Sequence, residues 1–241
     1  MKVNSGKREP LYYVSSKVKV EGQKGIIHNG NIDLTGKQEI KQERKKVARQ
    51  NNLNNSNVME LKSGQKINFS DLKLKSNDII LGLEWESKNI QVDVDISMFL
   101  VNKNGITEEA NFVFYGNKTS TDKSVNLEED MNKGLKDSYN QVVAINLSKV
   151  DENIEKIAIT ATIYNENQNF RDITNGIINI IDPVDIRNIV AFNFSNNSEN
   201  QNAIVIAEMY KHNDKWKFSA VGKGFFGGLE ALCKNFGIET E

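Results

Sequence analysis

The stretch IQVDVDISMFLV, residues 90–101, decides the fold of this chain. Apolar and acidic residues alternate from Val92 to Ile96, so a strand here would point its valines to one side and Asp93 and Asp95 to the other. A period of two over a short run is typical of a strand with one buried face and one solvated face. We therefore expect a half-buried strand whose apolar side faces a core.

Similar runs recur along most of the chain. Eight further segments rich in Val, Ile, Phe and Tyr are separated by turns that contain Asn, Asp or Gly. They are Asp78–Glu86, Ala110–Tyr115, Gln141–Leu147, Lys156–Tyr164, Gly176–Ile181, Val190–Phe194, Ala203–Tyr210 and Lys215–Val221. A helical period occurs only in Phe226–Phe236, where one face holds Leu229, Leu232, Cys233 and Phe236. The sequence predicts an all-β fold, a two-sheet antiparallel β-sandwich with a short C-terminal helix.

The first part of the chain differs in composition. Residues 1–57 hold twelve Lys/Arg and five Asp/Glu, a net charge of +7, whereas residues 58–241 hold nineteen and twenty-seven, a net charge of −8. Two strand-like runs, Leu11–Val20 and Gly25–Leu34, precede a basic stretch from Lys37 to Gln50 that tolerates a helix. We expect residues 1–58 to form a basic arm and linker with strand and helix pieces, and residues 59–241 to form the sandwich domain. The opposite net charges of the arm and the sandwich domain are informative about binding partners and not about the fold.

Several classes of protein are disfavoured. The single cysteine, Cys233, excludes an internal disulfide framework and fits a reducing compartment or an assembly that does not rely on disulfides. No apolar run approaches the roughly 18 residues of a membrane span, and no apolar segment follows the charged start, so neither a membrane protein nor a secretory signal is expected. His28 and His212 lie outside any catalytic or zinc signature. We predict that the chain is not an enzyme and that it is cytoplasmic or part of a virion or phage-like particle.

Three blocks resemble a known family. They are GLEWE (82–86) followed by VDVDISMFL (92–100), NFVFYGN (111–117) followed by STDKSV (120–125), and the long ending from Ala207 to Ile238. In order and spacing they resemble the TerD family, the tellurite-resistance and bacterial stress-protein domain, from about Met59 to Ile238. The resemblance implies a calcium-binding β-sandwich with no established catalytic activity. Residues 1–57 lie outside it.

Acidic residues could hold a calcium ion. Asp93 and Asp95 lie about 7 Å apart on one strand face, where they repel each other unless they are solvated or bridged by a cation. Ca²⁺ takes six to eight oxygen ligands from mixed sources, and no His or Cys is near in sequence, which disfavours zinc. The candidate ligands are Asp93, Asp95, Asn117, Asp122, Asp130 and Asp137. The alternative is that these acidic residues are simply a solvated surface.

The resemblance also implies a degenerate site. Asp93, Asp95 and Asp130 match acidic positions of the family pattern, but Tyr139-Asn140-Gln141 stands where the family has further acids. One of the two metal sites of the family is therefore expected to be lost or weakened here.

Two functions from different classes follow. A polar arm with few apolar residues cannot form a core of its own, so its order must come from another subunit. This favours a non-enzymatic interaction subunit of a larger protein assembly, a homo-oligomer or a phage-like particle, that binds protein through Lys37, Lys41, Arg44, Lys45 and Arg49. The alternative is a cytoplasmic, calcium-binding stress or tellurite-resistance protein. Nucleic-acid binding is disfavoured because the arm offers only Tyr12 and Tyr13 as aromatic residues.

Overall fold

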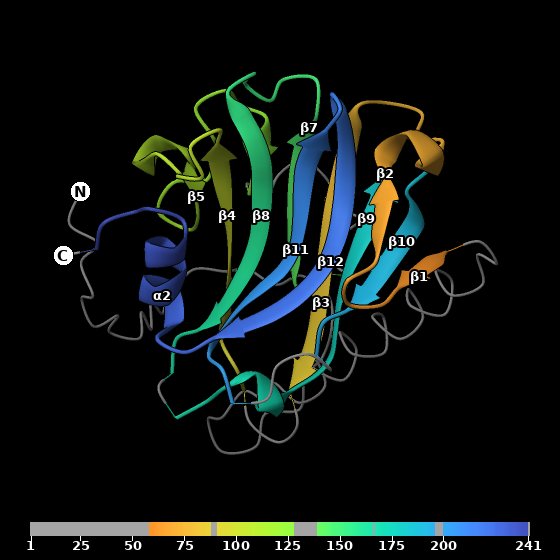
Figure 1. Ribbon diagram of the computed structural model, residues 1–241. Coiled ribbons are helices and arrows are strands. Elements are labelled where there is room, and N and C mark those ends of the chain that lie inside the picture. The colour runs from red at the N-terminus through yellow and green to blue at the C-terminus, as the bar shows by residue number, and fades with distance from the viewer. Residues whose placement is uncertain (1–57, 88–90, 128–138, 166, 196–199, 241) are drawn as a thin grey trace, which may run out of the picture.

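Two β-sheets packed face to face form the molecule (Figure 1). The structure is a computed structural model, and it describes residues 58–87, 91–127, 139–165, 167–195 and 200–240. The arm predicted for residues 1–58 therefore lies outside the described residues, apart from residue 58. The predicted two-sheet sandwich with one short C-terminal helix is confirmed.

Each sheet has six strands within these ranges. Sheet I has the order β1-β10-β9-β3-β7-β6, with β1 (Met59–Leu61), β10 (Arg187–Asn193), β9 (Ile173–Asp182), β3 (Asp78–Ser87), β7 (Gln141–Asn146) and β6 (Val125–Asn126). Sheet II has the order β2-β12-β11-β8-β4-β5, with β2 (Lys66–Asn68), β12 (Lys215–Phe225), β11 (Ala203–His212), β8 (Ile154–Ile163), β4 (Val94–Asn102) and β5 (Phe112–Val113). Short 3₁₀ turns occur at Phe69–Leu72, Glu109–Asn111 and Phe170–Asp172.

One strand pair departs from the expected antiparallel arrangement. The edge strand β1 runs parallel to β10, with Met59 opposite Val190 and Leu61 opposite Phe192. The prediction of a wholly antiparallel sandwich is wrong for this pair. A three-residue edge strand has no turn that fixes its direction, so its direction depends on how it docks rather than on a pattern in the sequence.

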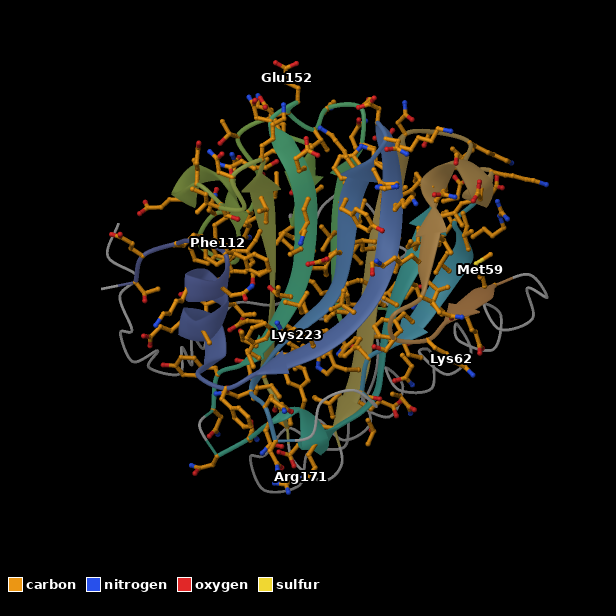
Figure 2. All side chains as sticks on the ribbon, viewed as in Figure 1. Met59, Lys62, Phe112, Glu152, Arg171 and Lys223 are labelled. Atoms are coloured by element: carbon orange, nitrogen blue, oxygen red, sulfur yellow. The ribbon has the colours of Figure 1, made fainter. Side chains whose placement is uncertain are left out.

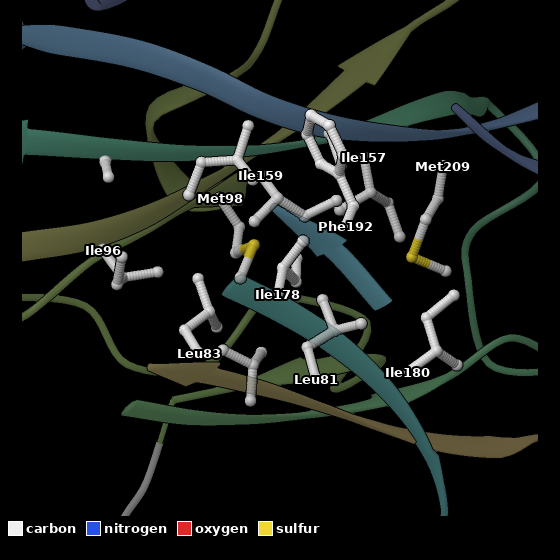
Figure 3. Close-up of a cluster of buried hydrophobic side chains, with 14 of the residues drawn as sticks. Leu81, Leu83, Ile96, Met98, Ile157, Ile159, Ile178, Ile180, Phe192 and Met209 are labelled. Atoms are coloured by element: carbon white, nitrogen blue, oxygen red, sulfur yellow. The ribbon is translucent and has the colours of Figure 1, made fainter. Parts of the chain in front are cut away.

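The core lies between the sheets and follows the period-two pattern. Alternate residues of β3 and β9, such as Leu81 and Ile178, meet alternate residues of β4 and β8, such as Met98 and Ile159 (Figure 3). All four side chains are buried. The intervening positions point to the outer faces of the sandwich, where most charged residues of the strands are found, whereas Asp182 at the end of β9 is buried.

A single helix of the described part, α2 (Gly228–Asn235), covers part of the outer face of sheet II (Figure 1). Leu232 and Cys233 bury against Phe99 and Val205 in a second apolar cluster. Burial raises the pKa of the Cys233 thiol to about 11, which keeps it protonated as a packed apolar residue. The helix starts two residues later than the predicted Phe226 because the turn before it needs a positive φ, 101° at Gly227.

Candidate functional site

The first two calcium candidates lie where the alternation predicted. Asp95 belongs to β4 and Asp93 precedes the first residue of that strand, while Val94 and Ile96 are buried. Asp93 is exposed. Both carboxylates therefore point to the outer face of sheet II at the beginning of β4.

The carboxylate of Asp122 accepts hydrogen bonds that stabilise the turn before β6. One carboxylate oxygen accepts hydrogen bonds from the hydroxyl of Ser120 (2.7 Å) and the backbone N–H of Ser124 (2.8 Å). The other accepts the backbone N–H of Asp151 at 2.8 Å. Burial alone would raise the pKa of this carboxyl, but the hydrogen bonds outweigh it and the pKa is lowered from its ordinary value. Asp122 thus joins the turn before β6 of sheet I to the loop before β8 of sheet II.

Asn117 also has a structural role. Its side-chain NH₂ donates to the carbonyl oxygens of Phe112 (2.9 Å) and Ala110 (3.3 Å). Its backbone pairs with Phe114 across the turn after β5. The amide nitrogen therefore closes this turn.

An open pocket of about 790 Å³ lies beside Asp122. Asp151 and Glu108 contribute further carboxylates to its wall, and Lys103 contributes a cation. Amide side chains complete the polar lining, at Asn102, Asn104, Asn111 and Asn153. The sequence did not point to this grouping, because the residues come from separate loops and carry no shared motif.

The structure does not bring all predicted ligands together. The pocket with Asp122 lies at the Asn102 end of β4, whereas Asp95 lies near its beginning. Seven residues of strand span roughly 23 Å, far beyond the roughly 2.5 Å from an ion to its ligands. Within the described ranges no three His, Cys, Asp or Glu side chains are grouped to hold a metal.

The remaining candidates lie outside the described residues. These are Asp130 and Asp137 of the metal set and Lys37, Lys41, Arg44, Lys45 and Arg49 of the partner-binding set. A calcium site made by Asp93 and Asp95 together with Asp130 stays a prediction, and so does protein binding by the arm.

Tyr139, Asn140 and Gln141, which the sequence resemblance set against acids of the family pattern, contact the framework. The ring of Tyr139 lies over Gly82, where an added Cβ would approach it to 2.7 Å, and its hydroxyl donates to Asn188 Oδ1 at 2.9 Å. Asn140 Oδ1 accepts the backbone N–H of Trp85 at 3.1 Å, beside the irregularity in β3. Gln141 donates to a neighbouring carbonyl. Burial raises the pKa of Tyr139 to about 12, although the hydrogen bond to Asn188 acts in the opposite direction.

The two sheets carry opposite charge. The strands of sheet I hold five Asp/Glu and one Lys/Arg, a net charge of −4. The strands of sheet II hold three Asp/Glu and six Lys/Arg, a net charge of +3. Figure 2 shows Lys223 of β12 on sheet II, well separated from Glu152 at the far end of the sandwich.

Known structures define the class of fold. The crystal structure of a homologue of telluride resistance protein (TerD) from Streptomyces coelicolor A3(2) aligns with a TM-score of 0.51 at 17% identity. The alignment covers 64% of this chain and 94% of that one. The molecule is thus a β-sandwich of the same fold as that homologue.

Sequence comparisons give the family. The chain is 31% identical to "Uncharacterized protein YceE" of Bacillus subtilis (strain 168), over 76% of this chain and 100% of that protein. It is 28% identical to "Tellurium resistance protein TerD" of Serratia marcescens, over 76% and 98% of the two chains, and 29% identical to "General stress protein 16U" of Bacillus subtilis (strain 168), over 76% and 99%. The TerD domain model matches residues 58–236. The chain belongs to the TerD domain family.

The helices of the described ranges are too short or too polar to cross a membrane.

Proposed function

We propose that this protein is a non-enzymatic TerD-family subunit that assembles with other protein subunits through residues 1–57, in a stress or tellurium-resistance response. The observation that carries the proposal is the opposition of charge within one chain, +7 on residues 1–57 and −8 on residues 58–241. A basic segment attracts an acidic surface of a neighbouring subunit, most strongly at low ionic strength.

The names of the relatives support the biological setting. One is named for tellurium resistance and another as a general stress protein. These names support an assembly within a bacterial stress response more than a virion component.

A binding role also agrees with the chemistry of the described surface. His212, the histidine of the described part, is exposed at the turn between β11 and β12, away from Asp122 and the pocket. Cys233 is buried with a raised pKa, the opposite of an activated nucleophile. Among the described residues, neither His212 nor Cys233 has the partners that acid–base or nucleophilic catalysis needs.

Sedimentation of the full chain and of a chain beginning at Met59 tests the proposal. We expect an oligomer for the full chain and a folded monomer for the shortened one, because residues 1–57 supply the contact between copies. If the shortened chain keeps the oligomeric state and loses only melting temperature, these residues brace their own domain and the proposal fails.

Calcium binding is a second candidate, favoured by the outward placement of Asp93 and Asp95 at the start of β4. Two carboxylates on one strand face form half of an oxygen-rich cation site. Calorimetry in EDTA-stripped buffer should give one weak site, which the double variant Asp93→Asn, Asp95→Asn removes and Asp122→Asn leaves intact. Two tight sites, or no heat at all, would contradict this candidate.

A further inference from the structure

The outer face of β2 and β12, at one edge of sheet II, is basic. Together these two strands carry four lysines and no Asp or Glu. On β12 the lysines occupy positions that alternate with Phe218 and Ala220, which face the core, so the lysine side chains point outward. Lys66 of β2 lies opposite Ser219 of β12 on the same outer side. The lysines of this basic strip are Lys66, Lys215, Lys217 and Lys223.

The lysines of the basic strip are accessible to a partner. Three of them are exposed and Lys217 is half-buried. Within the described part of the chain none of the four forms an ion pair. On the adjoining strand β11, Glu208 is bound to Lys156, with Oε1 2.9 Å from Nζ. Asp71 and Asp214 lie in the turns beyond the start of β12, where Asp71 already accepts side-chain hydrogen bonds. The strip can therefore bind anionic groups of another molecule.

A pocket of about 390 Å³ opens beside the start of the strip, where the turn between β11 and β12 lies next to the 3₁₀ turn that follows β2 (Figure 1). This volume is within the range of ligand pockets. Hydroxyl and amide side chains contribute to its wall, and no Asp or Glu of the described residues does. Four apolar side chains and two lysines form the rest of the wall, namely Phe69, Leu74, Leu147, Trp216, Lys73 and Lys215. The pocket therefore combines an apolar lining with two exposed cations.

The pocket and the strip together fit an extended acidic ligand with one apolar group. Lys215 belongs to both, and Lys223 lies further along β12, about 26 Å away along the strand. An extended peptide segment of about eight residues spans the same distance. A large side chain seated in a pocket, with surrounding contacts that exclude water, is the common form of an interface hot spot. We propose that this end of sheet II binds an acidic, extended segment of a partner protein, whose large apolar side chain enters the pocket.

An acidic peptide fits this surface better than a nucleic acid does. Single-stranded nucleic acid binds where a long basic groove is combined with aromatic rings that stack on the bases. The ring of Tyr210 beside the strip already has Lys66 Nζ 5.7 Å from its centroid, and the ring of Trp216 has Lys211 Nζ at 5.5 Å. Residues 58–241 carry a net charge of −8, which repels a polyanion that extends beyond the strip. A short acidic segment avoids both disadvantages.

This surface is distinct from the contact proposed for residues 1–57, so the full-length chain can be tested by fluorescence anisotropy whatever its oligomeric state. Two labelled octapeptides cover both directions along β12. One has phenylalanine at its first position and the other at its last, and glutamate and aspartate alternate elsewhere. At about 0.1 M salt we expect at least one of them to bind. Replacing its phenylalanine by serine should weaken binding about tenfold, because the pocket is left unfilled. Replacing its acids by glutamine should weaken binding at least as much.

Substitution of two lysines of the strip adds a matched control. The double variant Lys215→Gln, Lys217→Gln should weaken binding of the better peptide about tenfold. The double variant Lys118→Gln, Lys234→Gln removes the same charge at exposed positions outside the strip and should change binding less than about twofold. All four side chains are exposed or half-buried, so both variants should keep a melting temperature close to that of the parent chain.

Several results would overturn the inference. Equal weakening by the two double variants, or binding that neither of them changes, would mean that the peptide binds elsewhere, for example on the basic residues 1–57. Absence of binding by both peptides, or binding to which the phenylalanine contributes nothing, would contradict the proposed use of the strip and the pocket. Tighter binding of an eight-nucleotide oligothymidylate than of either peptide would show that the surface selects nucleic acid and not an acidic protein segment.

Discussion

Sheet I and sheet II share one core but have different outer faces. Toward the core both present aliphatic residues with a period of two, such as Leu81 on β3 and Ile157 on β8 (Figure 3). Away from the core, sheet II carries α2 on a stack of phenylalanines and an excess of lysines, while sheet I carries Tyr139 on an apolar centre with an excess of carboxylates. The comparison teaches that the two sheets build the core in the same way, whereas their outer faces differ in charge and in what covers them.

The largest expected effect concerns the cover of sheet II. Phe99 is fully buried between the rings of Phe112 and Phe236, with ring centroids 4.5 and 4.6 Å away. Phe99→Ala should lower the free energy of unfolding by about 3–5 kcal/mol, because it leaves a cavity beneath α2. Denaturant unfolding measures the loss. Phe226→Ala, at a side chain that is 70% exposed, is the control and should stay within about 0.5 kcal/mol. Equal effects of the two changes would contradict the role of the stack.

The corresponding change on sheet I replaces Gly82. A Cβ there would lie 2.7 Å from the ring of Tyr139, so the ring must move off the sheet. Gly82→Ala should cost about 1–3 kcal/mol of unfolding free energy in denaturant titration. Gly82 has no positive φ, so its cost should come from the contact with the ring, whereas Gly105→Ala, with φ of +81° and nothing within 4 Å, measures a backbone cost without a clash. If the ring is what the added methyl group meets, the double variant Gly82→Ala, Tyr139→Ala should lose less unfolding free energy than the sum of the two single changes. A loss equal to that sum would contradict this contact.

The link between the two sheets gives a pH-dependent prediction. The lowered pKa of Asp122 means that its carboxylate stabilises the fold above about pH 4 and that this contribution is lost as pH falls through the folded pKa. Asp122→Asn should cost about 1–2 kcal/mol at neutral pH. It should also flatten the decline in stability below about pH 4 relative to the parent chain. A variant with unchanged stability and an unchanged acid limb would show that the hydrogen bonds to Ser120, Ser124 and Asp151 contribute nothing.

The smallest expected effect is at the hydroxyl of Tyr139. Tyr139→Phe removes the hydrogen bond to Asn188 and should cost about 1 kcal/mol at neutral pH. Because the folded pKa is raised to about 12, the contribution is complete below the ordinary value of about 10 and is lost as pH rises toward 12. Stability measured between these limits should fall more steeply for the parent than for Tyr139→Phe. Parallel curves would contradict this assignment.

The sequence predicted the longer strands of the two sheets, but it did not predict three of the four edge strands. All nine predicted strand runs contain strands, because each alternates or concentrates β-branched and aromatic residues. The edge strands β1, β2 and β6 were missed since two or three residues carry no periodicity. The strand predicted for Ala110–Tyr115 covers only Phe112–Val113, because a 3₁₀ turn precedes it and the turn at Asn117 follows.

The candidate site was readable only in part. The outward placement of Asp93 and Asp95 followed from alternation along one strand, which is local information. The engagement of Asp122 with the backbone N–H of Asp151 joins two loops 29 positions apart, and no local pattern encodes such a contact. The opposite charges of the two sheets likewise emerge only once the strands are assigned to sheets.

The mass of the full-length chain as a function of salt tests the central claim most directly. If assembly depends on attraction between basic residues 1–57 and acidic residues of a neighbouring subunit, it should be strongest at about 0.1 M salt or below and weaken at about 1 M, where the screening length drops to about 3 Å. Analytical ultracentrifugation should therefore show an oligomer that dissociates toward a folded monomer as salt rises. A monomer at every salt concentration, or an oligomer whose mass does not respond to salt, would contradict the account.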